Sequence, residues 1–569
     1  MASSGGAYSQ WRLVVHLRNY LQRSAPVIES LERELPELLT KATSSANVKH
    51  NSSSKNNVDK EQTVNSLAAE SILNANIVPP APPPSPSKSG TDLKNILQTV
   101  NAYIPLVWSQ LSSNWFETKP EAPAIVEQPV KAKQPMPKWL TKKKSLVSKA
   151  SVDARTRYLV RSLGDHLTDG GRLRKLEDLC EHLKFFPQAK GCAVKSEGIS
   201  RVLRMISKSN DPYVTAQAYE TLALLGYTAP VKANGIRILS IDGGGVRGLV
   251  ALEILRKLEK EAGQPIHELF DYICGVSTGA ILTVLLGAHR DELDHCEILY
   301  RNLSTQIFSQ TRLQGAKGLV MRSSFYNSEE WNEILIDNMG EEMLFETARD
   351  PKNPKIGIVA TQSNTMRIQA YMLRNYNLPY RVASHYNGTS HAKLWEAVRA
   401  TTAAPGYFSE YKIGDTILLD GGLMVNNPTA IAIHEARQLW PDAEFQCVVS
   451  LGTGRHEPIE TVNETSINWG TRIKTIVNSA TDTEGVHTIM HDLLPGNVYF
   501  RFNPYLSEEF TLDEIAPERL EIMMEDTGLY LRKNQHKIKE AAQALTKPKS
   551  QLGKMTDWYN LQTQTHNNY

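Results

Sequence analysis

The pattern of apolar and polar positions predicts alternating strands and helices between residues 236 and 288. Apolar, mostly β-branched residues at 236, 238, 239 and 241 predict a buried strand that ends in glycines. Apolar residues then recur at three- and four-residue steps from Leu249 to Leu258, which is typical of a helix. A second strand at 272–274 leads into a sharp turn, and 280–286 follows as a buried helix. This alternation predicts an α/β fold.

Two glycine-rich turns after these strands carry the candidate chemistry. Ser277 lies in Gly-x-Ser-x-Gly between Gly275 and Gly279, a turn that exposes the hydroxyl at the carboxyl end of a strand. The first strand ends in Gly243, Gly244 and Gly245. Glycines can aim successive backbone N–H groups at one point, as an oxyanion hole requires, because no Cβ blocks a close approach. Together the two turns indicate acyl transfer.

The same glycine loop fits a second class of protein. Residues 243–248 match Gly-x-Gly-x-x-Gly, the fingerprint of a dinucleotide-binding loop between a strand and a helix. A nucleotide-binding oxidoreductase would need an acidic residue at the end of the next strand, about twenty residues further on. That strand instead runs into Gly275 and Ser277. A third alternative is a catalytically silent lipid-binding scaffold that uses a helical region nearer the N-terminus.

A late strand supplies a candidate base. Residues 417–419 predict a strand that ends at Asp420, followed by Gly421 and Gly422. A buried carboxylate within hydrogen-bond reach of a serine can act as a base if its pKa is raised. Three histidines are candidates by position alone, since none follows a strand into a glycine turn: His385, His391 and His434.

These motifs resemble those of the patatin-like phospholipases, which use a serine–aspartate dyad instead of a triad. Residues 242–248, with Asp242, Arg247 and Gly248, look like the glycine-rich oxyanion motif of the family. Residues 275–279 look like its nucleophile elbow, and 420–422 look like its base motif. Residues 402–408 resemble the Ala-Ala-Pro-x-x-Phe segment beside the family's site. Within the family, the chain looks most like the calcium-independent phospholipases A2 of the gamma type.

The resemblance implies a three-layer α/β/α catalytic domain and a calcium-independent phospholipase A activity on fatty acyl esters of glycerophospholipids. In that reaction Ser277 is the nucleophile, Asp420 is the base, and the N–H groups of the glycine loop hold the oxyanion. Arg247 either orders the glycine loop or meets a phosphate. No metal and no cofactor is expected. The expected partner is an anionic phospholipid membrane surface.

Composition along the chain predicts five regions. Residues 1–41 form an N-terminal amphipathic region, and 42–153 form a linker rich in Pro, Ser and Lys that we expect to be disordered. Residues 154–230 show three short amphipathic helices, which suggests a small armadillo-like stack. The catalytic domain is expected at 236–435. Residues 436–569 complete it with a strand at 445–451 and helices at 511–546, where Thr511 and Glu514 form a candidate capping box.

Charge is unevenly placed in the N-terminal part. Residues 1–28 contain no Asp or Glu and alternate arginines with apolar residues, as mitochondrial transit peptides do; a surface or peripheral membrane helix is the alternative. Seven lysines lie between 131 and 149 around Trp139 and Leu140, which suits either a solvated linker or docking on anionic lipid. The chain ends in Asn568 and Tyr569 rather than in Ser-Lys-Leu, a peroxisomal signal that proteins of the gamma type often carry. The endoplasmic reticulum and the peroxisome are the alternatives to a mitochondrial location.

Overall composition excludes several classes of protein. The formal net charge of +2 gives no global field for nucleic acid. The five cysteines show no Cys-x-x-Cys spacing, which argues against zinc and against a disulfide framework, and favours an intracellular, reducing setting. The longest apolar run, 273–288, is short for a bilayer, which needs about twenty residues.

Overall fold

The computed structural model describes residues 147–164, 168–309, 326–456 and 483–566. Three predictions concern residues outside this part of the chain: the N-terminal targeting region, the linker rich in Pro and Ser, and most of the lysine-rich segment with Trp139 and Leu140.

The described residues contain one mixed sheet of nine strands. Its order is β5-β4-β3-β2-β1-β8-β9, with β7 paired to β3 and β6 paired to β7. The strands are β1 (Ile236–Ile241), β2 (Tyr272–Val276), β3 (Lys355–Gln362), β4 (Gln369–Arg374), β5 (Asn387–Thr389), β6 (Tyr411–Ile413), β7 (Thr416–Leu419), β8 (Phe445–Leu451) and β9 (Tyr499–Phe502).

The direction of the strands brings the candidate motifs to one end of the sheet. Strands β1, β2, β3, β8 and β9 run parallel, so their carboxyl ends share an edge. Strand β7 runs antiparallel to β3, with Leu419 opposite Thr361. The base motif after β7 therefore approaches the nucleophile from the opposite direction, and it meets β3 before that strand ends.

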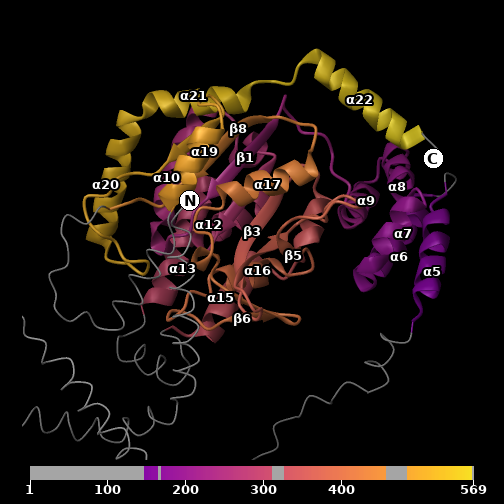
Figure 1. Ribbon diagram of the computed structural model, residues 1–569, viewed down its shortest axis with the longest axis horizontal. Helices are drawn as coiled ribbons and strands as arrows, with labels where there is room; N and C mark the ends of the chain where they lie inside the picture. Colours follow the sequence, from indigo (N-terminus) through magenta and orange to yellow (C-terminus); the bar gives the residue numbers. More distant parts are fainter. Residues whose placement is uncertain (1–146, 165–167, 310–325, 457–482, 567–569) are drawn as a thin grey trace, which may run out of the picture. The chain divides into compact units, whose positions relative to one another are not determined.

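Helices cover both faces of the sheet, as predicted for a three-layer domain. On β1, Leu239 and Ile241 pack into one core and Ile236 and Ile238 into the other, because alternate side chains point to opposite faces. Figure 1 shows α17 and α19 in front of the strands. The core of the front face includes α17 (Thr429–Leu439) and α19 (Thr483–Leu493). The core of the other face includes α10 (Gly248–Ala262), α12 (Thr278–Thr283), α13 (Leu293–Phe308), α15 (Ser328–Met339), α16 (Leu394–Thr401), α20 (Pro517–Lys533) and α21 (Gln535–Thr546).

Between residues 147 and 235, the part of the chain that the structure describes has its own core and five α-helices instead of the three expected. The three predicted helices are present, and the last is capped as expected: the Asp211 carboxylate accepts the N–H groups of Tyr213 and Val214, and Gly226 ends the helix with a positive φ of 77°. The first helix begins at Lys149, before the predicted end of the linker at residue 153. The helices are α5 (Lys149–Arg161), α6 (Asp169–Phe185), α7 (Lys190–Lys195), α8 (Gly198–Ser207) and α9 (Pro212–Leu225).

The C-terminal third confirms one prediction and corrects another. The strand predicted at 445–451 is β8, and it pairs with β1. The capping box at Thr511 and Glu514 is wrong, because α20 begins only at Pro517. Glu514 instead accepts the N–H of Ala516 and forms an ion pair with Arg519 at 2.6 Å, so its carboxylate is used in the loop before the helix. A last helix, α22 (Gln551–His566), was not predicted.

The apolar run at 273–288 is buried in the domain core. It forms the end of β2, then α12 and one wide helical turn at Val284–His289. Among the described residues, none of the helices combines the length and the apolar character needed to cross a bilayer.

Candidate active site

The turn after β2 holds Ser277 in a strained backbone conformation. Ser277 has φ 52° and ψ −117°, which is rare for a residue with a side chain and costs on the order of 1–3 kcal/mol. A methyl group on Gly275 would lie 2.2 Å from the Gly279 carbonyl oxygen, and one on Gly279 would lie 2.3 Å from the Ile241 carbonyl oxygen. Only glycine fits at either position, so both flanking glycines are needed for the turn.

Thr401, at the end of α16, fixes the nucleophile from the side. The Ser277 N–H donates to the Thr401 hydroxyl oxygen at 3.0 Å, and that hydroxyl donates to the Val359 carbonyl on β3. The next turn of chain lies beside the base, because the Ala403 carbonyl accepts the N–H of Asp420 at 3.0 Å. Sequence reasoning placed residues 402–408 near the site only through the resemblance, and it missed Thr401.

Asp420 stands at the end of β7 with its side chain against Ser277. Its main-chain carbonyl accepts the Thr361 hydroxyl at 2.8 Å, and its Oδ1 accepts the Gly422 N–H at 2.7 Å. Burial raises the pKa of Asp420 to about 6, although hydrogen bonds from the Gly422 N–H and the Ser277 hydroxyl act to lower it. The structure therefore brings the predicted nucleophile and base together, with Asp420 buried and Ser277 half-buried. Gly421 packs against the Val359 carbonyl, where a side chain would collide.

The glycine loop offers two free N–H groups rather than three. The Gly243 N–H donates to the Asn426 carbonyl at 3.2 Å. In the part of the chain that the structure describes, the N–H groups of Gly244 and Gly245 have no acceptor. Gly245 has a positive φ of 57°, a conformation that glycine adopts without strain. The loop thus presents two adjacent donors beside the nucleophile turn.

Tyr300 on α13 connects the two turns. Its hydroxyl donates to the Gly245 carbonyl and contacts the Thr278 hydroxyl, directly after Ser277. Gly248 opens α10 against this tyrosine. Arg247 donates from Nε to the Gly244 carbonyl at 3.2 Å, and burial lowers the pKa of its guanidinium. The arginine therefore orders the loop, one of the two roles expected for it.

Asp242, the residue before the three glycines, is held by β9. Its Oδ2 lies 2.7 Å from Nη2 of Arg501, and both side chains are 2% exposed. Burial raises the pKa of Asp242 to about 6, against the opposing charge of Arg501. The Thr453 hydroxyl after β8 donates to the Gly243 carbonyl at 3.0 Å. Strands far along the chain thus hold the glycine loop. No local sequence pattern indicates Arg501, because only sheet pairing brings β9 beside this loop.

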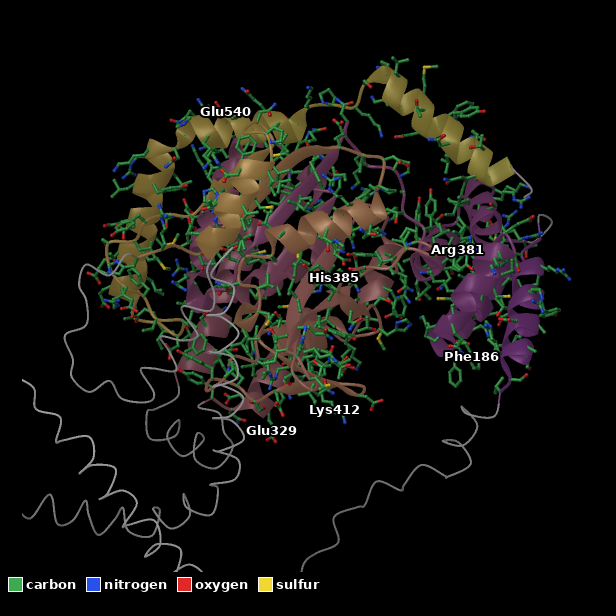
Figure 2. The ribbon with its side chains drawn as sticks, in the orientation of Figure 1. Phe186, Glu329, Arg381, His385, Lys412 and Glu540 are labelled. Carbon is green, nitrogen blue, oxygen red and sulfur yellow. The ribbon has the colours of Figure 1, made fainter. Side chains whose placement is uncertain are left out.

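The three histidines have partners elsewhere. His385 is exposed between β4 and β5 (Figure 2), and its main-chain N–H donates to Nε2 of His434 at 3.2 Å. His391 Nδ1 lies 3.3 Å from the Ser390 hydroxyl. Among the described residues, the partners of the Ser277 N–H and hydroxyl are Thr401 and Asp420, and neither is a histidine.

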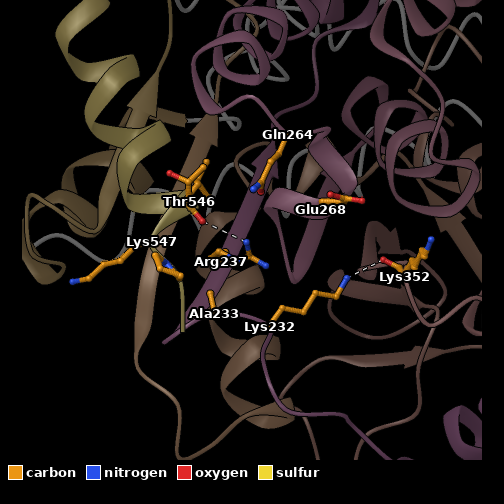
Figure 3. Close-up of a pocket in the computed structure, with 10 residues that line it drawn as sticks. Lys232, Ala233, Arg237, Gln264, Glu268, Lys352, Thr546 and Lys547 are labelled. Carbon is orange, nitrogen blue, oxygen red and sulfur yellow. Dashed lines mark hydrogen bonds between the residues drawn. The ribbon is translucent and has the colours of Figure 1, made fainter. Parts of the chain in front are cut away.

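A cavity of about 390 Å³ lies at the other end of the sheet (Figure 3). Its lining includes Arg237 at the start of β1, which forms an ion pair with Asp271 at 3.1 Å. Lys232 also lines the cavity, and its ammonium group donates a hydrogen bond to the Lys352 carbonyl at 3.0 Å. The cavity is therefore separate from Ser277, which follows the carboxyl end of β2. Within the described residues, His, Cys, Asp and Glu form no group of three that could hold a metal ion.

Several known phospholipases are similar to this chain in sequence. Residues 239–433 match the family model described as patatin-like phospholipase. The chain is 45% identical over 422 residues to calcium-independent phospholipase A2-gamma of Oryctolagus cuniculus, covering 74% of this chain and 54% of that protein. The protein of the same name from Homo sapiens is 45% identical over 424 residues, with the same coverage. Phospholipase A I of Arabidopsis thaliana is 29% identical over 459 residues, covering 66% of this chain and 34% of that protein. The chain spans about half the length of the curated phospholipase A2-gamma relatives it matches.

Proposed function

Because residues 239–433 form a patatin-like phospholipase domain, we propose that this chain is a lipid acyl hydrolase that cleaves fatty acyl esters of glycerophospholipids. The observation that carries the proposal is the half-buried Ser277 beside the buried carboxylate of Asp420, whose pKa the Ser277 hydroxyl acts to lower. A base with a pKa of about 6 is mostly ionised at neutral pH, yet it holds a proton far better than an ordinary carboxylate. That combination suits a dyad that works without histidine.

The geometry supports a two-step reaction. Asp420 takes the proton of Ser277 as Oγ attacks the ester carbonyl, and the negative oxygen that forms meets the N–H groups of Gly244 and Gly245. The C–O bond to the lysophospholipid then breaks, and Asp420 returns the proton to the departing oxygen. Water, deprotonated by the same carboxylate, attacks the acyl-serine; the bond to Oγ breaks, Asp420 passes the water's proton to Oγ, and the fatty acid leaves. The strain at Ser277 keeps Oγ in the attacking position throughout.

The direct test is substitution of the dyad in the full chain. Ser277→Ala should lower hydrolysis of phospholipid vesicles and of p-nitrophenyl butyrate on the order of a thousandfold or more, with the melting temperature preserved. Asp420→Asn should lower the rate of hydrolysis by a factor on the order of 10²–10⁴, because a dyad has no second base. Substituting His385, His391 or His434 by Ala serves as the control and should leave turnover unchanged. Full turnover in Ser277→Ala would rule the proposal out.

Two further tests separate this function from its alternatives. A fluorophosphonate probe should label the chain at Ser277, whereas a silent scaffold would stay unlabelled. Activity should persist in excess EDTA, since the relatives are named calcium-independent and the proposed steps use only side chains and backbone. Loss of turnover in EDTA that added calcium restores would contradict the proposal.

The substrate lies in a bilayer, so the proposal includes a docking surface and a location. The lysine-rich segment with Trp139 and Leu140 would bind anionic lipid, each lysine adding about 1 kcal/mol at low salt. Because Ser148 caps α5, the deletion that tests this ends at residue 146. Removing 118–146 should weaken sedimentation with anionic vesicles while leaving hydrolysis of p-nitrophenyl butyrate unchanged. A mitochondrial location follows from the acid-free residues 1–28, and a reporter fused to residues 1–41 would test it.

A further inference from the structure

Two adjacent asparagines follow the base motif, and their surroundings differ. The Asn427 side chain is 1% exposed and fully used: its Nδ2 donates to the Thr483 carbonyl at 3.1 Å, and its Oδ1 accepts both the N–H and the hydroxyl of Thr429. The Asn426 side chain is half-buried, and its amide has no hydrogen-bond partner within the described ranges. The Asn427 side chain therefore has a structural role, whereas the Asn426 amide remains available for a hydrogen bond to a ligand.

The backbone ties Asn426 to the glycine loop. Its carbonyl accepts the Gly243 N–H at 3.2 Å, which removes that N–H from the donors available to a substrate. The same contact fixes the position of Asn426 relative to Gly244 and Gly245. The residue that occupies the first donor of the loop is thus also the one that carries an unused amide.

The Asn426 side chain lies between the glycine loop, the nucleophile and the base. A methyl group placed on Gly243 would lie 2.5 Å from Oδ1 of Asn426 and 3.3 Å from Cβ of Ser277. A methyl group placed on Gly422 would lie 3.1 Å from the same Oδ1 and 3.0 Å from Oδ1 of Asp420. The Asn426 amide and the Ser277 side chain therefore flank one point. An amide presents two N–H donors beside its oxygen, and a half-turn of the group exchanges the two ends.

We propose that Asn426 is a further catalytic residue, whose side-chain amide donates a hydrogen bond to the ester oxygen as it becomes negative. This inference rests on the proposed acyl hydrolase function. The Asn426 amide takes the place of the Gly243 N–H, so that the oxyanion accepts hydrogen bonds from the N–H groups of Gly244 and Gly245 and from the Asn426 side chain. Side-chain amides serve in this way beside backbone N–H groups, and removing one such donor typically lowers kcat by 10²–10³.

The test compares the two asparagines in the full-length chain, with p-nitrophenyl butyrate as substrate. Asn426→Ala should lower kcat at least tenfold, and on the order of a hundredfold, with KM within about threefold and the melting temperature unchanged. Asn427→Ala is the matched control: it should lower the melting temperature, while the kcat of the folded fraction stays within about threefold of wild type. Labelling by a fluorophosphonate should slow in Asn426→Ala by a factor similar to that for kcat/KM.

A second variant keeps the inference testable if Asn426→Ala does not fold. Asn426→Asp has the same shape, but its ionised carboxylate donates no hydrogen bond at pH 8, so it should lose at least as much kcat. A loss of less than tenfold in a folded Asn426 variant would overturn the inference. If the wild-type chain hydrolyses no ester at all, the proposed function fails; if wild type and Asn426→Ala turn over alike, only the role of Asn426 fails.

Discussion

At the scale of single residues, two buried carboxylates beside the glycine loop have similar acidity and different neighbours. Burial raises the pKa of both Asp420 and Asp242 to about 6. Asp420 accepts the Ser277 hydroxyl, whereas Asp242 is paired with Arg501. Of the two, only Asp420 is in a position to take a proton from Ser277. The acidity of the two groups therefore does not distinguish the base, and their contacts do.

This difference predicts a pH profile with one acidic limb. The base works in its ionised form, so kcat/KM should be constant above a pH of about 6 and fall tenfold per unit below it. Steady-state rates with p-nitrophenyl butyrate between pH 4.5 and 8 measure this limb. The matched control is Asp242→Asn, which removes the other carboxyl with a similar pKa and should leave the limb in place. If the acidic limb disappeared in Asp242→Asn, the titrating group would be Asp242 and the assignment to Asp420 would be wrong.

The sequence pattern predicted the site residues that come directly after a predicted strand. Ser277 and Asp420 each stand where an apolar run meets a glycine turn, so a local pattern reveals them. The residues around them carry no such signal. Thr401 ends a helix, Tyr300 lies within one, and Arg501 is part of a late strand. They reach the site only through tertiary packing, which a single sequence does not show.

At the scale of elements, β9 is a structural part of the candidate active site although it lies beyond the matched residues 239–433. It pairs with β8 and carries Arg501 to Asp242, with an additional hydrogen bond from Arg501 to the Ser450 hydroxyl at 3.1 Å. Sequence patterns predicted β8 correctly and missed β9, a four-residue strand whose Arg501 interrupts the apolar run. They also placed the late helix too early, because Glu514 bonds within a loop.

Removing Arg501 should therefore destabilise the whole domain. Arg501→Met leaves the Asp242 carboxylate buried without a counter-charge, which should cost roughly 3–5 kcal/mol of unfolding free energy at pH 8. Below the raised pKa of Asp242 the carboxyl is protonated, so the cost should shrink as the pH falls towards 5. Urea denaturation at the two pH values measures both. The double variant Arg501→Met/Asp242→Asn should recover part of the loss at pH 8, and no recovery would contradict the ion-pair explanation.

At the scale of the molecule, the helical region and the catalytic domain share a buried carboxylate. Glu220 on α9 is fully buried, with Oε2 2.7 Å from Nε of Arg349 in the catalytic domain and Oε1 2.7 Å from Nζ of Lys184. Phe345, beside Arg349 in the short helix Leu344–Arg349, belongs to the core of the helical region. The two regions are thus joined by packing and by charge, and we expect them to unfold together.

Substituting Arg349 tests this coupling. Arg349→Met leaves the buried Glu220 with Lys184 as its counter-charge and the Cys180 thiol as a hydrogen-bond donor. It should cost about 1–3 kcal/mol of unfolding free energy, since a charged group loses one of its partners. Arg301→Met is the matched control: its partner Glu297 also keeps a second arginine but is 23% exposed, so the cost should stay below about 1 kcal/mol. Calorimetry should show one transition that moves down in Arg349→Met. Two separate transitions, or equal costs in both variants, would contradict the coupling.

The place of β1 in the sheet also bears on how the chain is made. Its two neighbours are β2, which follows soon after it, and β8, which begins at residue 445. While the ribosome is still synthesising the residues between them, β1 has one edge unpaired, and the arginine that neutralises Asp242 does not yet exist. Nascent chains that end before β8 should therefore be prone to aggregation and dependent on chaperones, even when they already contain all the candidate catalytic motifs. We therefore expect the proposed ester hydrolysis only from chains long enough to include β9.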